Sequence, residues 1–235
     1  MEVTKCYLYN NRSMGKDKKS CTPVGIVIHS TGANNKYVKR YIQPSKDDIN
    51  YDQLIEKIGK NKFNNSWNRS TVNKSIHYMI GLFADNTVQA VQAMPTDLCC
   101  WACGSGKNGS YNYPPTAHIQ IECCEDNLKD SDYFYNVYSK LVSVVVKLCI
   151  EYNFTTDKIV SHKEAHKLGY ASNHKDIDHW FSKFGKTMDI FRTDVGIAMN
   201  LIKNSLNNCP SNNFNFILKT KDGVYDVTGV WKRIR

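Results

Sequence analysis

The chain has 235 residues, of which 41% are hydrophobic and 23% charged, and its formal net charge is +9. This length and composition suit one folded domain of ordinary to large size, or one domain with a small appendage, and exclude wholesale disorder. No run approaches the roughly 18 apolar residues of a membrane-spanning helix. Residues 1–20 are polar and rich in lysine, without the apolar segment of a classical secretory signal, so neither membrane insertion nor that export route is expected.

The excess of Lys and Arg over Asp and Glu, 31 against 22, favours a polyanionic partner. Nucleic acid, anionic lipid and an acid-rich cell wall all satisfy that condition, and a basic protein without such a partner is the alternative. No helix-turn-helix, zinc-finger spacing or RNA-recognition signature accompanies the charge, so nucleic acid is not the expected partner.

Nine cysteines are too sparse for a disulfide scaffold, and an odd number cannot all pair. We therefore expect mostly free thiols in a protein made in a reducing cytosol. Cys99-Cys100 and Cys123-Cys124 should each place one residue in the core, since neighbouring strand residues face opposite sides. Cys100 and Cys103 have the C-x-x-C spacing, but no second pair follows, so a zinc or redox motif is not favoured.

The hydrophobic pattern predicts strands that alternate with helices. In chain order the predicted elements are a buried strand at 24–29, a helix at 51–58, a hairpin of strands at 75–82 and 87–93, a loop at 104–116 and a strand at 117–123. A long helix marked by the apolar residues of 134–152 and capped near Asp130 or Ser131 follows, then a strand at 159–162 and a helix at 188–202. We expect an α/β domain whose central mixed β-sheet is flanked by helices. Residues 1–208 are assigned to this domain, and residues 209–235 to a short extension with a small β-hairpin that turns at Asp222-Gly223.

The histidines provide the first candidates for a functional site. The seven are His29, His77, His118, His162, His166, His174 and His179. His29 and His162 stand at the carboxyl ends of short apolar strands, the edge at which open α/β sheets form sites. Two imidazoles from different strands and one carboxylate from a following loop make a zinc site with an open fourth position. Asp176, in the loop 171–176, is a candidate carboxylate, so a zinc groove is expected at one strand edge.

Zinc-assisted hydrolysis also needs a proton acceptor. Glu122 ends the strand 118–122, and its neighbours are apolar residues or cysteine, so an unpaired surface role is not expected. A carboxylate beside an activated water can take its proton and pass it to a leaving amine.

Several stretches, in this order and spacing, carry a resemblance to a known family. They are residues 26–32, 75–80, 85–89, 101–104, 118–122, 159–164, 174–176 and 180–181. Over roughly residues 20–195 the chain resembles the zinc-dependent N-acetylmuramoyl-L-alanine amidases of the phage-lysozyme and peptidoglycan-recognition-protein type.

The resemblance implies a zinc ion held by His29, His162 and Asp176. It also implies that Glu122 is the catalytic glutamate, and that the bond cleaved is the amide between the lactyl group of N-acetylmuramic acid and L-alanine. The implied partner is peptidoglycan, both its stem peptide and its glycan, with anionic wall polymers as a further partner.

The chain departs from the family pattern in three places. The family's Trp-His-Ala-Gly is Trp-Ala-Cys-Gly at 101–104, so a substrate contact by that histidine is lost or replaced. The family's Asp-Pro-Gly is Asp-Ile-Asp at 176–178. A lysine often lies two residues before the third ligand; here the residue is His174, whose imidazolium would stabilise an oxyanion only while protonated. His174 is therefore a second candidate catalytic residue.

Two residues are candidates for contacting the substrate, and each has a structural alternative. His77 either lines the cleft or is a half-buried structural histidine, and Trp101 opens the altered motif at 101–104. His118 begins a strand and is expected to be structural.

Alternatives to the ligand set also exist. Asp178 is the main rival of Asp176 as the third ligand. His166 lies four residues after His162, a helical spacing for metal ligands, and His179 is a further candidate for coordination.

Two readings of the biology follow. The first is an endolysin of a phage or prophage that stays in the cytosol until a membrane pore opens, with a host autolysin as the variant. The second is a non-catalytic peptidoglycan-binding recognition protein. Such proteins typically lose a zinc ligand, whereas all three candidate ligands and Glu122 are present here.

Overall fold

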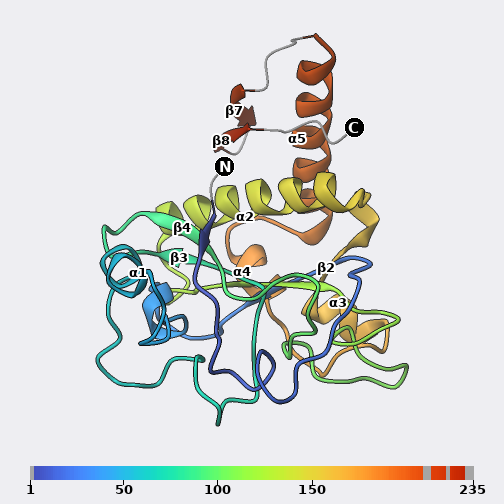
Figure 1. Cartoon of the computed structure of the whole chain (residues 1–235). Helices are drawn as coiled ribbons and strands as arrows, with labels where there is room; N and C mark the ends of the chain where they lie inside the picture. The colour runs from blue at the N-terminus through green and yellow to red at the C-terminus, as the bar shows by residue number, and fades with distance from the viewer. Residues whose placement is uncertain (1–2, 209–212, 221–222, 231–235) are drawn as a thin grey trace.

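The computed structural model describes residues 3–208, 213–220 and 223–230, with side chains for residues 3–204 (Figure 1). Its centre is a six-stranded sheet in the order β1-β4-β3-β5-β2-β6. The strands are β1 (Thr4–Lys5), β2 (Ile26–Ser30), β3 (Tyr78–Leu82), β4 (Val88–Gln92), β5 (Ile119–Cys123) and β6 (Ile159–Ser161). The β3–β4 pair is antiparallel and every other neighbouring pair is parallel. The predicted central mixed sheet is therefore confirmed.

Helices flank this sheet, as predicted. The α-helices in the described part of the chain are α1 (Tyr51–Ile58), α2 (Ser131–Tyr152), α3 (His162–Lys167), α4 (Asp178–Lys183) and α5 (Met188–Asn208). Short 3-10 helices span Val38–Arg40 and Thr156–Lys158. Helix α2 lies along one face of the sheet (Figure 1), and α4 and α5 pack with it into one apolar core.

The two faces of β2 and β5 differ in chemistry. Ile28 and Ile121 are fully buried in the core that contains α2, α4 and α5. The next residues along the two strands, His29 and Glu122, occupy paired positions. Because side chains alternate along a strand, these two point to the opposite face of the sheet. The same strands thus supply a core on one side and polar groups on the other.

Helix α2 is the central helix of the larger core. Asp130 caps it, since its carboxylate accepts a hydrogen bond from the Tyr133 backbone N–H at 3.0 Å, and Asn153 ends it in the left-handed conformation. The helix is long and apolar enough to cross a membrane by length and composition, but 67% of that stretch is buried inside the domain. This burial is that of a core helix in a folded domain.

Each predicted strand of the sheet differs from the observed one at one or both ends, as the strands predicted at 75–82 and 159–162 illustrate. The strand predicted at 75–82 begins only at Tyr78. The strand predicted at 159–162 ends at Ser161, and His162 is the first residue of α3. The cause is a capping box: Ser161 Oγ accepts from the Glu164 backbone N–H at 3.1 Å, and the Glu164 carboxylate accepts from the Ser161 N–H at 3.0 Å.

More of the cysteines that are adjacent in sequence are buried than the sequence predicted. Both members of Cys99-Cys100 and of Cys123-Cys124 are buried, rather than one of each. Cys123 lies in the α2 core, and Cys124 lies in a second core on the other side of the sheet. The alternation predicted for a strand holds, but both faces of this central strand are covered. The eight cysteines in the described part of the chain are free thiols.

The C-terminal strands β7 (Asn213–Thr220) and β8 (Gly223–Val230) pair antiparallel, with Thr220 opposite Gly223. The turn predicted at Asp222-Gly223 falls partly on residues 221–222, which lie outside the described residues. The division between a domain at 1–208 and an extension at 209–235 stays a prediction.

Candidate metal centre

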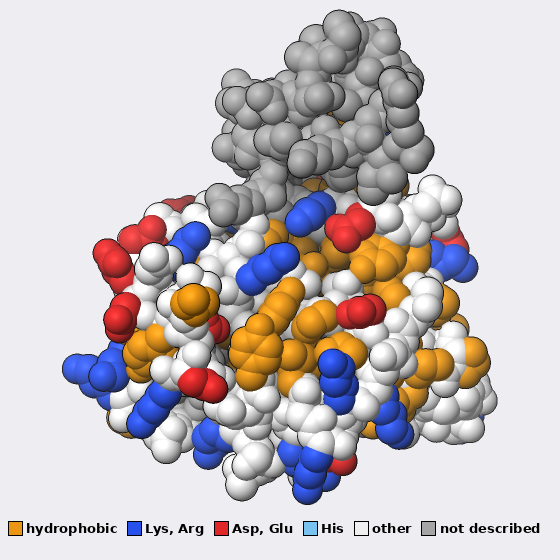
Figure 2. All heavy atoms as spheres, in the orientation of Figure 1, with side chains coloured by type: hydrophobic (Ala, Val, Ile, Leu, Met, Phe, Trp, Pro, Cys, Tyr) orange, Lys and Arg blue, Asp and Glu red, His pale blue; other side chains and the backbone are white. Residues whose placement is uncertain are grey.

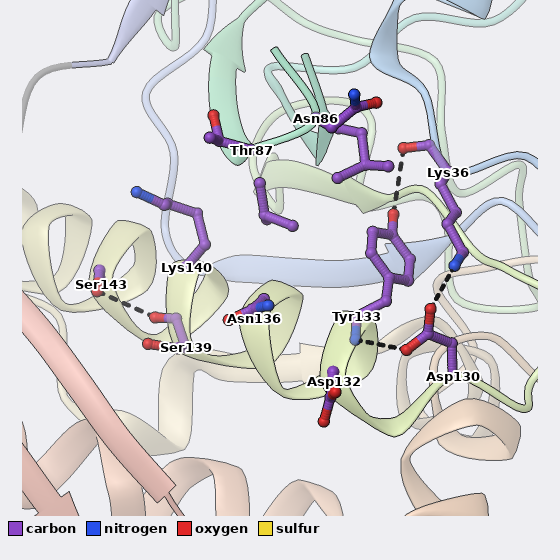
Figure 3. Close-up of a pocket in the computed structure, with 12 residues that line it drawn as sticks. Lys36, Asn86, Thr87, Asp130, Asp132, Tyr133, Asn136, Ser139, Lys140 and Ser143 are labelled. Carbon is purple, nitrogen blue, oxygen red and sulfur yellow. Dashed lines mark hydrogen bonds and ion pairs between the residues drawn. The ribbon is translucent and has the colours of Figure 1, made fainter. Parts of the chain in front are cut away.

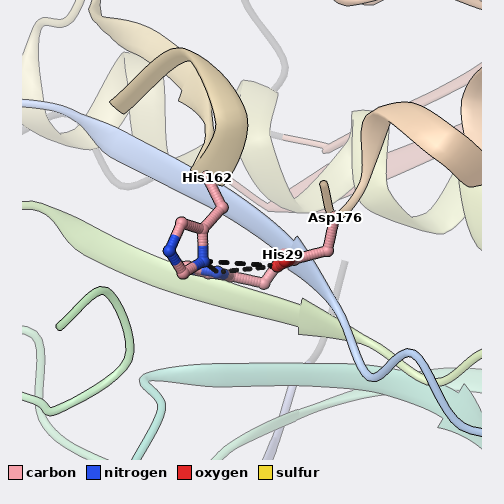
Figure 4. Close-up of side chains that lie close together, drawn as sticks. All are labelled: His29, His162 and Asp176. Atoms are coloured by element: carbon pink, nitrogen blue, oxygen red, sulfur yellow. Dashed lines mark hydrogen bonds and ion pairs between the residues drawn. The ribbon is translucent and has the colours of Figure 1, made fainter. Parts of the chain in front are cut away.

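Three side chains that the sequence predicts as ligands meet at the carboxyl edge of β2 (Figure 4). His29 Nδ1 lies 3.0 Å from His162 Nδ1 and 3.2 Å from Asp176 Oδ2. His162 Nδ1 lies 3.4 Å from the same Asp176 oxygen. Both histidines are buried, and the Asp176 side chain is 13% exposed. One facing atom from each residue thus points at a common centre.

The topology explains why residues so far apart in sequence converge. Strands β2 and β6 are neighbouring parallel strands, so the chain leaves both at the same edge of the sheet. His29 lies near the end of β2, and His162 directly follows β6. Asp176 lies just before α4, and the buried Trp180 anchors that helix in the core.

The distances between the three facing donor atoms show whether these residues fit a zinc ion. Tetrahedral coordination with bonds of about 2.0–2.1 Å to nitrogen and oxygen places donor atoms about 3.3 Å apart. The three separations, 3.0, 3.2 and 3.4 Å, match that value. Two imidazoles and one carboxylate are also a donor set of catalytic zinc sites with three protein ligands. The residues present fit a zinc ion with one open position.

The local electrostatics favour a cation at the same point. Burial raises the pKa of Asp176, but hydrogen bonds and charges from His162 and His29 lower it further, so the pKa lies well below its usual range and the group is a carboxylate. Burial lowers the pKa of His29, whereas hydrogen bonds with Asp176 and Cys103 raise it, and the net direction is well upward. Burial lowers the pKa of His162, which leaves a neutral imidazole, the form that binds metal.

Glu122 lies beside the three residues on the same face of the sheet. It is paired in register with His29 of β2 and Met79 of β3, and it is 9% exposed. Burial raises the pKa of Glu122 to about 8, although the charge of His29 opposes this rise. A carboxyl group with a pKa near neutrality is suited to accept a proton and return it.

A cleft of about 520 Å³ opens over the centre and contains the three candidate ligands, Glu122 and His174. His174 is 62% exposed, its Nδ1 lies 3.7 Å from Asp176 Oδ1, and its ring stacks on His162 at 4.8 Å. It is therefore placed at the rim of the centre rather than inside it.

The cleft wall contains groups that the sequence analysis missed. They are the cations Arg40, Arg69 and Lys74 and the aromatic residues Tyr41 and Trp67. Within the described side chains, none of the three cations forms an ion pair with an acidic residue. For Trp67, Arg69 and Lys74 a signal was present, since basic and aromatic residues cluster in the irregular segment 60–77, and binding residues concentrate on such loops. Arg40 and Tyr41 lie outside that segment, at the 3-10 helix Val38–Arg40.

The structure does not bring the two predicted substrate contacts to this cleft. His77 is 1% exposed; its Nε2 donates to the Leu98 carbonyl at 2.8 Å, and its Nδ1 accepts from the Gln120 N–H at 2.9 Å. Burial lowers the pKa of His77 to about 4, so it is a neutral structural residue. Trp101 does not line the cleft, and its ring lies under the Arg12 guanidinium at 5.6 Å.

The remaining alternatives have other partners. His166 Nδ1 lies 3.0 Å from the Ala171 carbonyl, and His179 Nε2 lies 3.1 Å from the Glu125 carboxylate. His118 Nδ1 lies 2.7 Å from the Thr116 carbonyl. Asp178 is the first residue of α4 and is not part of the cluster. Asp176 is therefore the carboxylate that the structure brings to the two histidines.

A larger cavity, of about 650 Å³, lies elsewhere, between the β3–β4 hairpin and α2 (Figure 3). Lys36 pairs there with Asp130 at 2.6 Å, and the Tyr133 hydroxyl donates to the Lys36 carbonyl at 3.2 Å. This cavity contains none of the candidate ligands, so the smaller cleft is the candidate functional site. On the face shown in Figure 2, Lys and Arg are interspersed with Asp, Glu and apolar side chains.

The structure defines an α/β domain, a mixed sheet flanked by helices, with a candidate zinc centre at one sheet edge. Residues 19–178, more than half of the chain, match the sequence profile of the N-acetylmuramoyl-L-alanine amidase family (Amidase_2), and the chain belongs to that family. It is a peptidoglycan amidase, as the sequence motifs predicted. A search of curated proteins found no match.

Solved structures share the fold at low sequence identity. The Staphylococcus aureus hydrolase AmiA in complex with its ligand has a TM-score of 0.52 at 16% identity, over 87% of this chain and 86% of that chain. The PlyG catalytic domain has a TM-score of 0.52 at 21% identity, over 85% and 96%. A mutant endolysin from Bacillus subtilis has a TM-score of 0.50 at 19% identity, over 83% and 99%. The predicted fold class is confirmed by these matches.

Proposed function

We propose that this amidase is a zinc enzyme in which His29, His162 and Asp176 hold the metal. The observation that carries the proposal is the set of three facing donor atoms, 3.0–3.4 Å apart, on the floor of a cleft that also contains a buried carboxyl group. When bound, zinc supplies Lewis-acid polarisation of the scissile carbonyl and makes a water molecule more acidic.

In this proposal Glu122 moves the proton. It accepts a proton from the attacking water as the water oxygen bonds to the lactyl carbonyl carbon. It then returns that proton to the alanine nitrogen as the carbon–nitrogen bond breaks, so one water is consumed and the Glu122 carboxylate is restored. Its burial supports the role, since the raised pKa allows both transfers near neutral pH.

His174 is proposed to stabilise the developing oxyanion while it is protonated. Its place at the cleft rim, stacked on His162 and 3.7 Å from Asp176, supports this role. A cationic donor aimed at developing negative charge lowers the barrier.

The walls of the cleft suit an acidic wall polymer. Arg40, Arg69 and Lys74 offer positive charge to stem-peptide carboxylates or anionic wall polymers, and Trp67 offers an apolar surface. Peptidoglycan stem and glycan are therefore the proposed ligands of this cleft.

We further propose that the protein acts as an endolysin, which stays in the cytosol until a membrane pore gives access to the wall. The free thiols suit synthesis in a reducing compartment. The fold is shared with an endolysin from Bacillus subtilis.

The products of wall digestion test the proposed reaction. Purified peptidoglycan treated with the full chain should release new alanine amino termini, and prior chelation should abolish the release until zinc is restored. New reducing sugar ends, or undiminished release after chelation, would contradict the proposal. Binding to the wall without any product would favour the recognition-protein alternative.

A further inference from the structure

A buried amide lies behind His29, on the side of the ring away from the other two candidate ligands. Gln120 of β5 is fully buried, and its Oε1 lies 2.7 Å from His29 Nε2. We propose that Gln120 is a positioning residue that holds His29 in the one tautomer whose Nδ1 can bind zinc. The inference rests on the proposed zinc site and adds a residue that the reaction itself does not use.

The orientation of the Gln120 amide follows from its other partner. Gln120 Nε2 lies 3.1 Å from the carbonyl oxygen of Tyr111, which also accepts from the His118 backbone N–H at 2.9 Å. A carbonyl oxygen can only accept, so the NH₂ group must face Tyr111. The Oε1 atom must then face His29.

This orientation determines which nitrogen of His29 carries the proton. An amide oxygen can only accept, so His29 Nε2 must donate to Gln120 Oε1 across the 2.7 Å contact. In the neutral ring, Nδ1 then has a lone pair, and it faces His162 and Asp176. The opposite tautomer would place two lone pairs against each other at 2.7 Å and direct a proton into the donor cluster.

A thiol supports the same arrangement. Cys103 is fully buried, its Sγ lies 3.0 Å from Gln120 Oε1, and it lies 3.8 Å from His29 Nε2. Its S–H is a second donor to the amide oxygen, which therefore acts as an acceptor on both sides.

The other histidine offers a matched comparison. Among the described residues, the polar side chain beside His162 Nε2 is Ser172, whose Oγ lies 3.4 Å away. The Ser172 hydroxyl donates to the Cys103 carbonyl at 3.0 Å, so its oxygen can accept from His162 Nε2, but over a longer contact than the 2.7 Å between His29 Nε2 and Gln120. Ser172 is thus the weaker partner, and it supplies a comparison position for Gln120.

The test is the zinc affinity of the full chain, measured by competition with a chromophoric chelator. Gln120→Met keeps the side-chain length but removes the acceptor, and it should weaken zinc binding about 10–100-fold, the usual effect of removing such an outer partner. Gln120→Glu should keep most of the affinity, because its carboxyl group still accepts from His29. Ser172→Ala removes only the longer contact to His162, so it should weaken zinc binding less than Gln120→Met does. Zinc affinity in Gln120→Met equal to that of the wild type would overturn the inference.

A second measurement does not depend on the folding of any variant. In the zinc-loaded wild type, the ¹H–¹⁵N spectrum should show a proton on His29 Nε2 that exchanges slowly with water. If that proton exchanges as fast as one on an exposed imidazole, the inference is wrong. The proposed zinc site fails separately, if the wild type binds no zinc or if His29→Ala binds it unchanged.

Discussion

Strands β2 and β5 contribute residues to both faces of the central sheet, and the two faces have different roles. Toward α2, Ile28 and Ile121 are fully buried in an apolar core. Toward the cleft, the alternate residues His29, Gln120 and Glu122 are equally buried but polar, and each is placed beside another polar group. Buried polar groups are costly unless they are paired. The comparison teaches that stability depends on the first face, whereas the chemistry depends on the second.

Removing one of the proposed zinc ligands should have the largest effect on activity. His29→Ala or His162→Ala should lose tightly bound zinc and with it the hydrolysis of wall fragments, because two protein ligands do not replace the three that catalytic zinc sites use. Metal content by mass spectrometry, alongside release of alanine amino termini, measures both effects. Full zinc occupancy in both variants would mean that the centre is elsewhere.

Removing the proton acceptor should separate chemistry from metal binding. Glu122→Gln should keep zinc but lose about 10²-fold or more in rate, the scale of general acid–base catalysis. Glu125→Gln is a matched control at a second buried carboxyl group, which is not part of the proposed proton transfer. Near-normal turnover by Glu122→Gln would show that Glu122 is only structural.

The same residue should set the acid side of the pH profile. The base must be the carboxylate, so the rate should fall as the pH drops through the pKa of Glu122. Burial raises that pKa to about 8, and a nearby zinc charge would lower it again. The midpoint should therefore lie above the ordinary glutamate value of about 4.3. Rate against pH for the wild type checks this, and a midpoint at the ordinary value would contradict the assignment.

His174 should affect the rate without the loss of zinc expected for the ligand variants. His174→Ala should lose about 10²–10³-fold in rate if the imidazolium is an oxyanion donor. His174→Lys should restore part of that rate, because its ammonium group also carries a positive charge. An alanine variant with full zinc and full rate would remove His174 from the mechanism.

A large-to-small substitution in the apolar core on the opposite face should lower stability and leave zinc binding unchanged. Ile121→Ala should lower the free energy of unfolding by about 2–5 kcal/mol, as large-to-small changes in packed cores do. Folded molecules of this variant should still bind zinc at the wild-type stoichiometry. Denaturant unfolding with zinc titration measures both, and zinc loss as complete as in His29→Ala would mean that the two faces are not separable.

Much of the difference between the apolar face and the polar face of the sheet could be predicted from the sequence. The apolar run before His29 and the strand that ends near Glu122 predicted both residues at one sheet edge, and the structure places them in paired positions. Gln120 was not singled out from the sequence, although alternation along β5 places it on the same face as Glu122. The sequence-based prediction extended the strand through His162 and did not use the capping box of Ser161 and Glu164, which explains why His162 begins a helix.

Other features depended on contacts across the fold. Asp176 and Asp178 are two residues apart, and only the path into α4 decides which of them meets the histidines. The sequence left His77 open between a cleft residue and a structural histidine. Its two nitrogens bond to Leu98 and Gln120, from distant parts of the chain, and these contacts decide for the structural role. Trp67 belongs to an irregular segment whose position no local pattern predicts.

X-ray absorption at the zinc edge of the zinc-loaded protein tests the central claim most directly. The account predicts a first shell of nitrogen and oxygen at about 2.0–2.1 Å, with the outer-shell scattering of imidazole rings. Cys103 lies 3.8 Å from His29 Nε2, behind that ring, so it should contribute no bond. A sulfur ligand at about 2.3 Å, or a shell without imidazole, would contradict the assignment of His29, His162 and Asp176.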